Sequence, residues 1–261
     1  KKMKINNDLR QDILSMIFNA KEGHLPSSFS IIDIINNLYT FHLRNIKSKK
    51  ITHRDIFILS KGHGSVALYA VLKKFKFISK KDTNSYTKKD SILGGHPDAN
   101  KINGIDFSTG SLGHGFPAAV GLAAALKILK SNHKVYCLVG DGECNEGTIW
   151  ESALIAANLK LDNLCCIVDD NKSSKQILPL PNLMKQFKAF GWNALSADGH
   201  DNKSLNFVFQ KFKKTKNKPT VIVAKTVKGK GISFVENKPM WHHKIPNMEE
   251  LKLSMKELSN K

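Results

Sequence analysis

The chain has 261 residues, of which 41% are apolar and 24% are charged, and its formal net charge is +19. A chain of this length and apolar content can bury a substantial core, which excludes a largely disordered protein. Its longest apolar run, Phe116 to Leu126, is shorter than the roughly 20 residues that a membrane-spanning helix needs. We therefore expect a folded cytoplasmic protein with no membrane insertion and no export signal.

The excess of positive charge comes from lysine. Of the 41 basic residues, only Arg10, Arg44 and Arg54 are arginine. Proteins that bind nucleic acid favour arginine and clustered basic patches. The densest basic run, residues 211–218, is typical of the end of a surface helix followed by a loop. We predict no nucleic-acid partner.

The four cysteines lie in or beside β-rich runs and lack Cys-x-x-Cys spacing. This placement predicts buried, reduced thiols rather than disulfides or a zinc site, and it fits a reducing cytoplasm. The cysteines are Cys137, Cys144, Cys165 and Cys166.

Amphipathic helical segments alternate with short β-rich segments along the chain. This alternation predicts an α/β fold, with a doubly wound parallel sheet that carries helices on both faces. Helices are expected at residues 8–20, 30–43, 65–77 and 117–130, and strands at 55–59, 134–139, 163–168 and 219–226. Ligands bind at the carboxyl ends of the strands in such sheets, so we expect the site in the turns after Leu59, Val139, Val168 and Thr226.

Five of the ten histidines directly follow a glycine, each in a separate expected loop. This repeated pairing predicts that the imidazoles converge on one polar cleft. The five are His24, His63, His96, His114 and His200.

The stretch "VGDGECNEG" at 139–147 follows a strand and begins like a phosphate-binding turn, but it contains three carboxylates. Asp141 and Glu143 would repel a phosphate placed directly in the turn. A divalent cation resolves the conflict, because Mg²⁺ is commonly held by one or two protein oxygens together with substrate phosphates. Asn171, thirty residues after Asp141, follows the next expected strand and could supply the second protein ligand.

The Gly-Asp-Gly and Asp-Asn pair resembles the thiamine-diphosphate motif, and the surrounding blocks resemble the transketolase family in family order, from about residue 8 to residue 250. The blocks are "GHLPSSFSIIDIINNLY", "ILSKGHGSVALYAVL", "GGHPD", "STGSLGHGFPAAVGLAAALK", "GDGECNEGTIWESALIAANLKLDNL", "AFGW", "DGHD", "KPTVIVAKTVKGKG" and "WHHKIPN". The resemblance implies one diphosphate-binding domain over residues 1–261.

The resemblance also implies the ligands of the cofactor. The side chains of Asp141 and Asn171 and the backbone carbonyl of Ser173 would coordinate Mg²⁺ or Ca²⁺, which neutralises the diphosphate of thiamine diphosphate. The residues implied in cofactor binding are His63, Gly110, Ser111, Leu112, Gly140, Asp141, Gly142, Glu143 and Asn171.

Four histidines match catalytic positions of the family: His24, His63, His96 and His242. By this resemblance they line the substrate channel, orient the sugar and move protons. Glu146 matches a carboxylate that links paired active sites in the family, although a first-turn glutamate favoured by the helix dipole explains it equally well.

The resemblance implies a transketolase that transfers a two-carbon ketol unit from a ketose or ketose phosphate to an aldose. The pyrimidine-binding and C-terminal domains are expected on a separate C-terminal subunit, which gives an α2β2 assembly that is inactive without this partner. Two alternatives stay open: the α subunit of a 2-oxo-acid dehydrogenase, and a non-catalytic cofactor-binding subunit.

Three positions depart from the family pattern. Pro26 is expected to stiffen a loop on the substrate side, His243 replaces a common glycine, and "KSSKQ" at 172–176 is atypical. These changes leave cofactor binding credible and favour a specialised sugar pathway.

Overall fold

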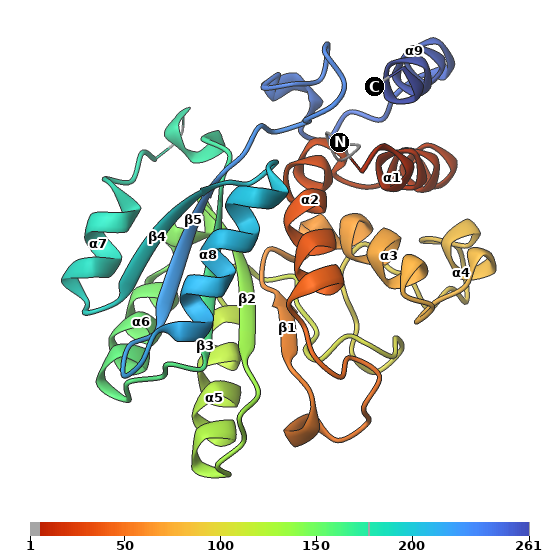
Figure 1. Cartoon of the computed structure of the whole chain (residues 1–261). Helices are drawn as coiled ribbons and strands as arrows, with labels where there is room; N and C mark the ends of the chain where they lie inside the picture. The colour runs from red at the N-terminus through yellow and green to blue at the C-terminus, as the bar shows by residue number, and fades with distance from the viewer. Residues whose placement is uncertain (1–5, 177, 261) are drawn as a thin grey trace.

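The protein is described here by a computed structural model that covers residues 6–176 and 178–260. Its centre is an all-parallel sheet with the strand order β1-β2-β3-β5-β4, flanked by helices (Figure 1). The strands are β1 (Ile56–Leu59), β2 (Val135–Gly140), β3 (Leu164–Asp170), β4 (Asn193–Asp198) and β5 (Thr220–Lys225).

The four strands predicted from the sequence are confirmed, and β4 is an additional strand. β4 has the sequence "NALSAD", without a β-branched or aromatic residue, and several of its side chains are not buried. It lies at the edge of the sheet and pairs only with β5. Residues 193–198 therefore form a strand because they pair with β5, and not because of their own β-propensity.

The four predicted helices are confirmed with small shifts of their ends, and the structure adds others. The basic run at 211–218 does include a helix end, because α8 stops at Lys214. The helices are α1 (Asn7–Ala20), α2 (Leu25–Phe41), α3 (Ser65–Lys74), α4 (Lys80–Asn84), α5 (Gly115–Ile128), α6 (Gly147–Asn158), α7 (Leu183–Ala189), α8 (Asn202–Lys214) and α9 (Met248–Ser259).

Helix α2 begins five residues before the predicted start at Ser30, and this corrects the interpretation of Pro26. Pro26 lies in the first turn of α2 rather than in a loop. Proline is tolerated there because the first helical N–H groups have no intrahelical acceptor to lose. The carbonyl of Pro26 accepts a hydrogen bond from the Gly229 amide at 3.0 Å, so this helix start is tied to the segment after β5.

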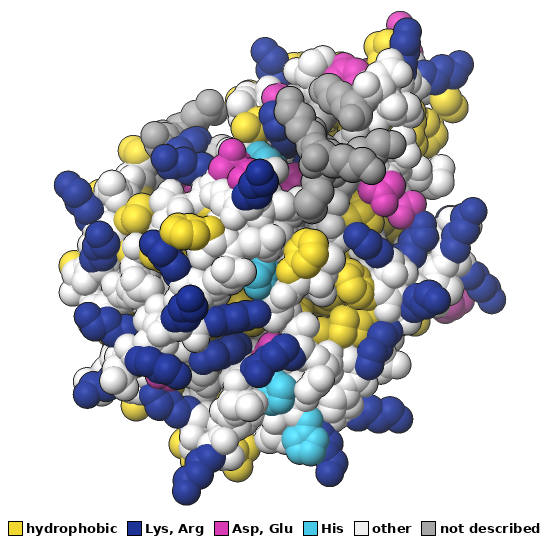
Figure 2. Space-filling model, in the orientation of Figure 1, with side chains coloured by type: hydrophobic (Ala, Val, Ile, Leu, Met, Phe, Trp, Pro, Cys, Tyr) yellow, Lys and Arg dark blue, Asp and Glu magenta, His cyan; other side chains and the backbone are white. Residues whose placement is uncertain are grey.

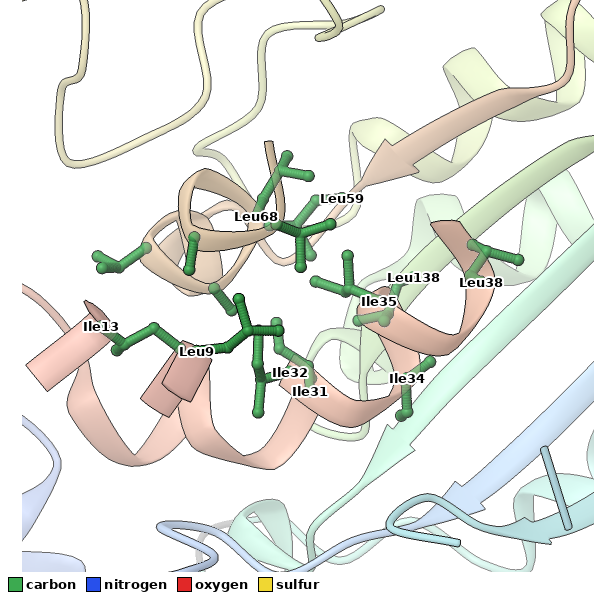
Figure 3. Close-up of a cluster of buried hydrophobic side chains, with 14 of the residues drawn as sticks. Leu9, Ile13, Ile31, Ile32, Ile34, Ile35, Leu38, Leu59, Leu68 and Leu138 are labelled. Atoms are coloured by element: carbon green, nitrogen blue, oxygen red, sulfur yellow. The ribbon is translucent and has the colours of Figure 1, made fainter. Parts of the chain in front are cut away.

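The strands alternate their side chains between two apolar layers. Tyr136 and Leu138 of β2 pack with α1, α2, α3 and α8 on one face, while Val135, Cys137 and Val139 pack with α5, α6 and α7 on the other. Figure 3 shows the first layer, with leucines and isoleucines of α1 and α2 against Leu59, Leu68 and Leu138. The doubly wound arrangement expected from the sequence is confirmed.

The distribution of basic side chains and the burial of the cysteines agree with what the sequence predicts. Lysine and arginine side chains are scattered over the face shown in Figure 2, with polar and apolar groups between them. No helix in the described ranges is both long and apolar enough to span a membrane. As predicted, the four cysteines are buried and free, and burial raises the pKa of each thiol.

One buried ion pair fastens α1 to α2. Arg10 of α1 donates to Asp33 of α2 at 2.6 and 3.0 Å, and neither side chain is more than 5% exposed. His200, before α8, adds a contact to the Asp33 carboxylate at 2.7 Å. Burial alone would raise the pKa of Asp33, but Arg10 and His200 hold it well below its usual value.

We expect Asp33→Ala to lower the free energy of unfolding by about 3–5 kcal/mol, because it leaves a buried guanidinium without its carboxylate. Asp12→Ala is the matched control: the Asp12 carboxylate also pairs with a basic side chain, Lys73, but is 36% exposed, so its loss should cost only about 0–1 kcal/mol. Urea unfolding measures both. Equal losses in the two variants would contradict the importance of the buried pair.

Candidate cofactor and substrate site

The two segments predicted to hold a metal lie side by side at the carboxyl edge of the sheet. Asp141 directly follows β2 and Asn171 directly follows β3. The two strands are neighbours in register, with Gly140 opposite Asp169, and the Asp141 amide donates to the Asp169 carbonyl at 3.1 Å. The parallel topology therefore brings together two residues that are thirty positions apart.

Asp141 is surrounded by short polar groups. Its carboxylate accepts from the Gly142 amide at 2.9 Å and from the Ser174 hydroxyl at 3.1 Å, and the Ser173 hydroxyl lies 3.4 Å away. The Asn171 side-chain oxygen accepts from the Ser173 amide at 3.0 Å. Burial and the nearby charge of Asp169 raise the pKa of Asp141. A bound divalent cation would offset both effects, so these oxygens fit a metal.

A second buried ion pair joins the loops of this edge. Lys61, just after β1, donates to Asp169 of β3 at 2.6 Å, and both side chains are essentially inaccessible to solvent. The same carboxylate accepts from Ser30 of α2 at 2.8 Å, from Asn171 at 2.9 Å and from the Thr226 hydroxyl after β5. Asp169 thus connects α2 with the carboxyl ends of β1, β3 and β5.

Glu143 lies beneath the turn and contacts backbone. Its carboxylate accepts hydrogen bonds from the Gly113 amide at 2.9 Å, the Gly140 amide at 3.1 Å and the Ser60 hydroxyl. The residue is only 1% exposed, and burial raises the pKa of its carboxyl group. In this structure Glu143 therefore joins the loop before α5 to the turn after β2, and its predicted contact with the cofactor stays a prediction.

The loop at 109–112 packs against the turn that carries His63. A Cβ on Gly62 would come within 2.9 Å of the Thr109 backbone, so only glycine allows this approach. A Cβ on Gly110 would lie 3.5 Å from the His96 ring. His63, His96 and the predicted segment Gly110 to Leu112 therefore belong to one continuous region, in which the ring of His96 is exposed.

Four imidazoles cluster beside this region. The centroid of the His24 ring lies 5.3 Å from that of His63, 5.5 Å from that of His242 and 4.6 Å from that of His243. Lys228, after β5, lies with Nζ 2.8 Å from the Nδ1 atom of His242. Chain segments from four different parts of the sequence thus form one basic, imidazole-lined surface.

His24, His63 and His242 are neutral at neutral pH. Burial, with the charges of nearby basic groups, lowers the pKa of His63 to about 2 and that of His242 to about 4. Burial is also the main cause of the lowered pKa of His24. A neutral imidazole has one nitrogen that donates a hydrogen bond and one that accepts one, which suits the binding of hydroxyl groups.

The expectation that all five Gly-His pairs converge is only partly correct. His24 and His63 are in the cluster, and His96 is near enough to contribute to the lowered pKa of His24. The ring of His200 instead contacts Asp33 and accepts from the Val227 amide at 2.9 Å, while His114 is exposed and contacts the Leu112 carbonyl. A glycine before a histidine affects only the local backbone conformation, and it does not decide which groups the imidazole ring contacts.

Four residues of this site were not predicted from the sequence. Ser174 lies in the atypical segment after Asn171, Lys61 and Lys228 lie inside family-like blocks, and His243 was noted only as a departure. A lysine directly before a Gly-His pair could have drawn attention to Lys61. Glu146, by contrast, is exposed at the start of α6, and its predicted role between active sites stays a prediction.

Comparison with known proteins places the chain in a family. Residues 2–258 match the model described as transketolase, thiamine diphosphate binding domain. The chain therefore belongs to the transketolase family, and the matched domain is the one that binds thiamine diphosphate.

Similar proteins narrow the type of transketolase. An apulose-4-phosphate transketolase subunit of Actinobacillus succinogenes is 40% identical, over 97% of this chain and 94% of that protein. A 6-deoxy-6-sulfo-D-fructose transketolase subunit of a Clostridium species is 36% identical with the same coverage. Both relatives are named as transketolase subunits and match this chain over nearly their whole length, and the matches do not favour a 2-oxo-acid dehydrogenase.

Longer transketolases contain the same domain. Human transketolase is 41% identical over 94% of this chain, but the match covers only 40% of that protein. The transketolase structure from Campylobacter jejuni superposes with a TM-score of 0.90 at 31% identity, over 98% of this chain and 42% of that one. The chain thus spans about two fifths of the solved transketolase chains it resembles.

We expect Glu143→Gln to lower the free energy of unfolding by about 1–3 kcal/mol. The Glu143 carboxylate accepts from the Gly113 and Gly140 amides through its two oxygens. In the variant, an NH₂ group would replace one of these oxygens and leave a buried donor without an acceptor. Glu146→Gln makes the same chemical change at an exposed position and should stay within about 0.5 kcal/mol of the wild type. Urea unfolding measures stability, and amide hydrogen exchange at Gly113 and Gly140 measures the local effect. Unchanged exchange in Glu143→Gln would show that Glu143 does not hold these loops.

Proposed function

We propose that the chain supplies the metal- and diphosphate-binding half of a split transketolase. Asp141 and Asn171, with the Ser173 carbonyl, would hold Mg²⁺ or Ca²⁺. The observation that carries this proposal is the buried Asp141 carboxylate beside Asn171, with its pKa raised by burial and by Asp169. A divalent cation is the group that stabilises the ionised form of such a carboxylate.

The surroundings of this metal site suit a diphosphate. Gly142 leaves the turn open, since a Cβ there would meet only the Ser174 side chain, at 3.8 Å. Lys228 and the buried Lys61 supply positive charge nearby. When bound, thiamine diphosphate would supply the electron sink that ketol transfer needs and that no protein side chain provides.

The histidine surface is the part of this chain that would handle the sugar. His24, His63 and His242 would orient sugar hydroxyl groups, and His96 would face the same channel from the loop against Gly110. Because His63 and His242 are neutral at neutral pH, each ring has one nitrogen that can donate a hydrogen bond and one that can accept one, which suits contacts with sugar hydroxyl groups. The Lys228 contact orients the ring of His242.

We further propose that this chain is one diphosphate-binding domain and that a separate C-terminal subunit completes the active site in an α2β2 assembly. Two relatives that match the chain over nearly their whole length are named as subunits of specialised sugar transketolases. The substrates would be a ketose phosphate or related ketose as donor and an aldose as acceptor. Four free buried thiols support a reducing compartment such as the cytoplasm.

The metal ligands can be tested by binding. We expect calorimetric titration of thiamine diphosphate into the chain with its C-terminal subunit to show tight binding that disappears on chelation of divalent metal and in Asp141→Ala. Glu151→Gln, which alters an exposed glutamate of α6, is the control and should bind like the wild type. Tight binding that survives both chelation and Asp141→Ala would overturn the assigned metal site.

The division of the enzyme can be tested by reconstitution. We expect neither protein by itself to transfer a ketol unit and the mixture of the two to do so, measured as aldose-dependent consumption of a ketose phosphate. His24→Ala should leave cofactor binding to the mixture unchanged but reduce turnover, because this residue is assigned to the substrate channel and not to the cofactor. Full activity of this chain alone would refute the split enzyme.

A further inference from the structure

Three histidines form a compact group beside the proposed cofactor site. His24 lies at the start of α2, while His242 and His243 follow the short turn at Pro239–Trp241. One ring nitrogen from each lies within 4.8 Å of the other two. The rings of His242 and His243 have centroids 4.5 Å apart and are nearly perpendicular. This is a different set of ligands from the oxygens around Asp141.

We propose that His24, His242 and His243 form a binding site for a first-row divalent transition metal, with Zn²⁺ as the representative ion. Imidazole nitrogens suit zinc, copper and nickel, whereas Mg²⁺ and Ca²⁺ prefer oxygen. Three histidines with a fourth, open position make the ligand set of many accessible zinc sites.

The geometry needs only a small contraction. Tetrahedral zinc with bonds of about 2.0–2.1 Å places two nitrogen ligands about 3.3 Å apart. His243 is exposed, so its ring can rotate toward the other two without disturbing the core. The turn that carries His242 and His243 is anchored by Trp241, which is 3% exposed. The backbone is therefore held while the rings adjust.

One ring nitrogen of His24 has no protein partner. Its Nδ1 atom is buried and has no hydrogen-bond partner among the residues that the structure describes. Metal ions bind an imidazole through a nitrogen that carries no proton. This nitrogen of His24 is therefore not already used by a hydrogen bond within the described part of the chain.

Lys228 is expected to weaken the binding of a metal ion at this site. Its Nζ lies 2.8 Å from the Nδ1 atom of His242, where it both occupies a ring nitrogen and places positive charge beside the cation. Burial lowers the pKa of Lys228, which reduces this repulsion without removing it. Removal of the ammonium should therefore tighten metal binding, whereas a purely structural role of Lys228 would leave it unchanged.

The consequence for catalysis rests on the proposed function. A metal held by His24 and His242 would occupy the two histidines that are assigned to the sugar, so Zn²⁺ should inhibit ketol transfer. This inhibition depends on His243, which is the third protein ligand. His24 and His242 alone would bind the ion more weakly. Inhibition should then compete with the sugar and not with the cofactor.

The binding test uses the untagged chain alone, so its outcome does not depend on the proposed activity. We expect calorimetry to show one Zn²⁺ bound per chain, and Co²⁺ to give the intense visible absorption of a tetrahedral nitrogen site. His243→Gln should weaken Zn²⁺ binding by at least about tenfold. Loss of a residue that only hydrogen-bonds to a metal ligand already costs about that much, and loss of the ligand itself should cost no less. Lys228→Met should strengthen Zn²⁺ binding.

Two matched variants separate this site from other metal-binding groups. His53→Gln removes an exposed histidine outside the cluster, and Asp141→Ala removes the proposed magnesium ligand; both should bind Zn²⁺ like the wild type. Absence of stoichiometric Zn²⁺ binding, or equal affinity in His243→Gln, would overturn the proposed site. In the reconstituted enzyme, inhibition by Zn²⁺ that persists unchanged in His243→Gln would overturn its assigned consequence.

Discussion

The ion pair between Lys61 and Asp169 is the interaction on which the candidate site depends. Lys61 follows β1, and Asp169 is the residue before the last one of β3. Because β2 lies between these two strands, the ion pair crosses the carboxyl end of β2, close to Gly140. Burial would raise the pKa of Asp169, but Lys61 and the hydrogen bonds from Thr226 and Ser30 lower it. Loss of either charge would leave the other buried and unpaired, which is costly. The pair therefore holds the loops of the site in one arrangement.

Around this pair, the charges are divided in a way that suits an anionic ligand with a metal. Burial and Asp169 disfavour the negative charge of Asp141 in the absence of a cation. Lys228 contributes positive charge beside His242, and His63 is neutral. The proposed diphosphate with its metal would complement both Asp141 and Lys228. The buried Glu143 carboxylate accepts hydrogen bonds from backbone amides, and its contact with the cofactor stays a prediction.

The sequence predicted the main features of the fold for reasons that are local. Four buried strands and four helices carry clear apolar periodicity, whereas β4 is formed by pairing with β5 and has no such signal. The turn after Asp141 and the position of Asn171 could be predicted because both follow buried strands. The predicted start of α2 is too late, because the proline at position 26 is typical of a loop when its hydrogen bond with Gly229 is unknown.

By itself, the sequence determined the family, the α/β architecture and the two segments that would hold a metal, because these depend on residue order and on periods of two and 3.6 residues. Only the tertiary structure decided which side chains meet across long separations. His200 pairs with Asp33, 167 residues away, instead of joining the other imidazoles. His243, noted in the sequence only as a departure, completes a group with His24. Such partners are selected by how loops pack at the edge of the sheet, and local sequence does not encode that packing.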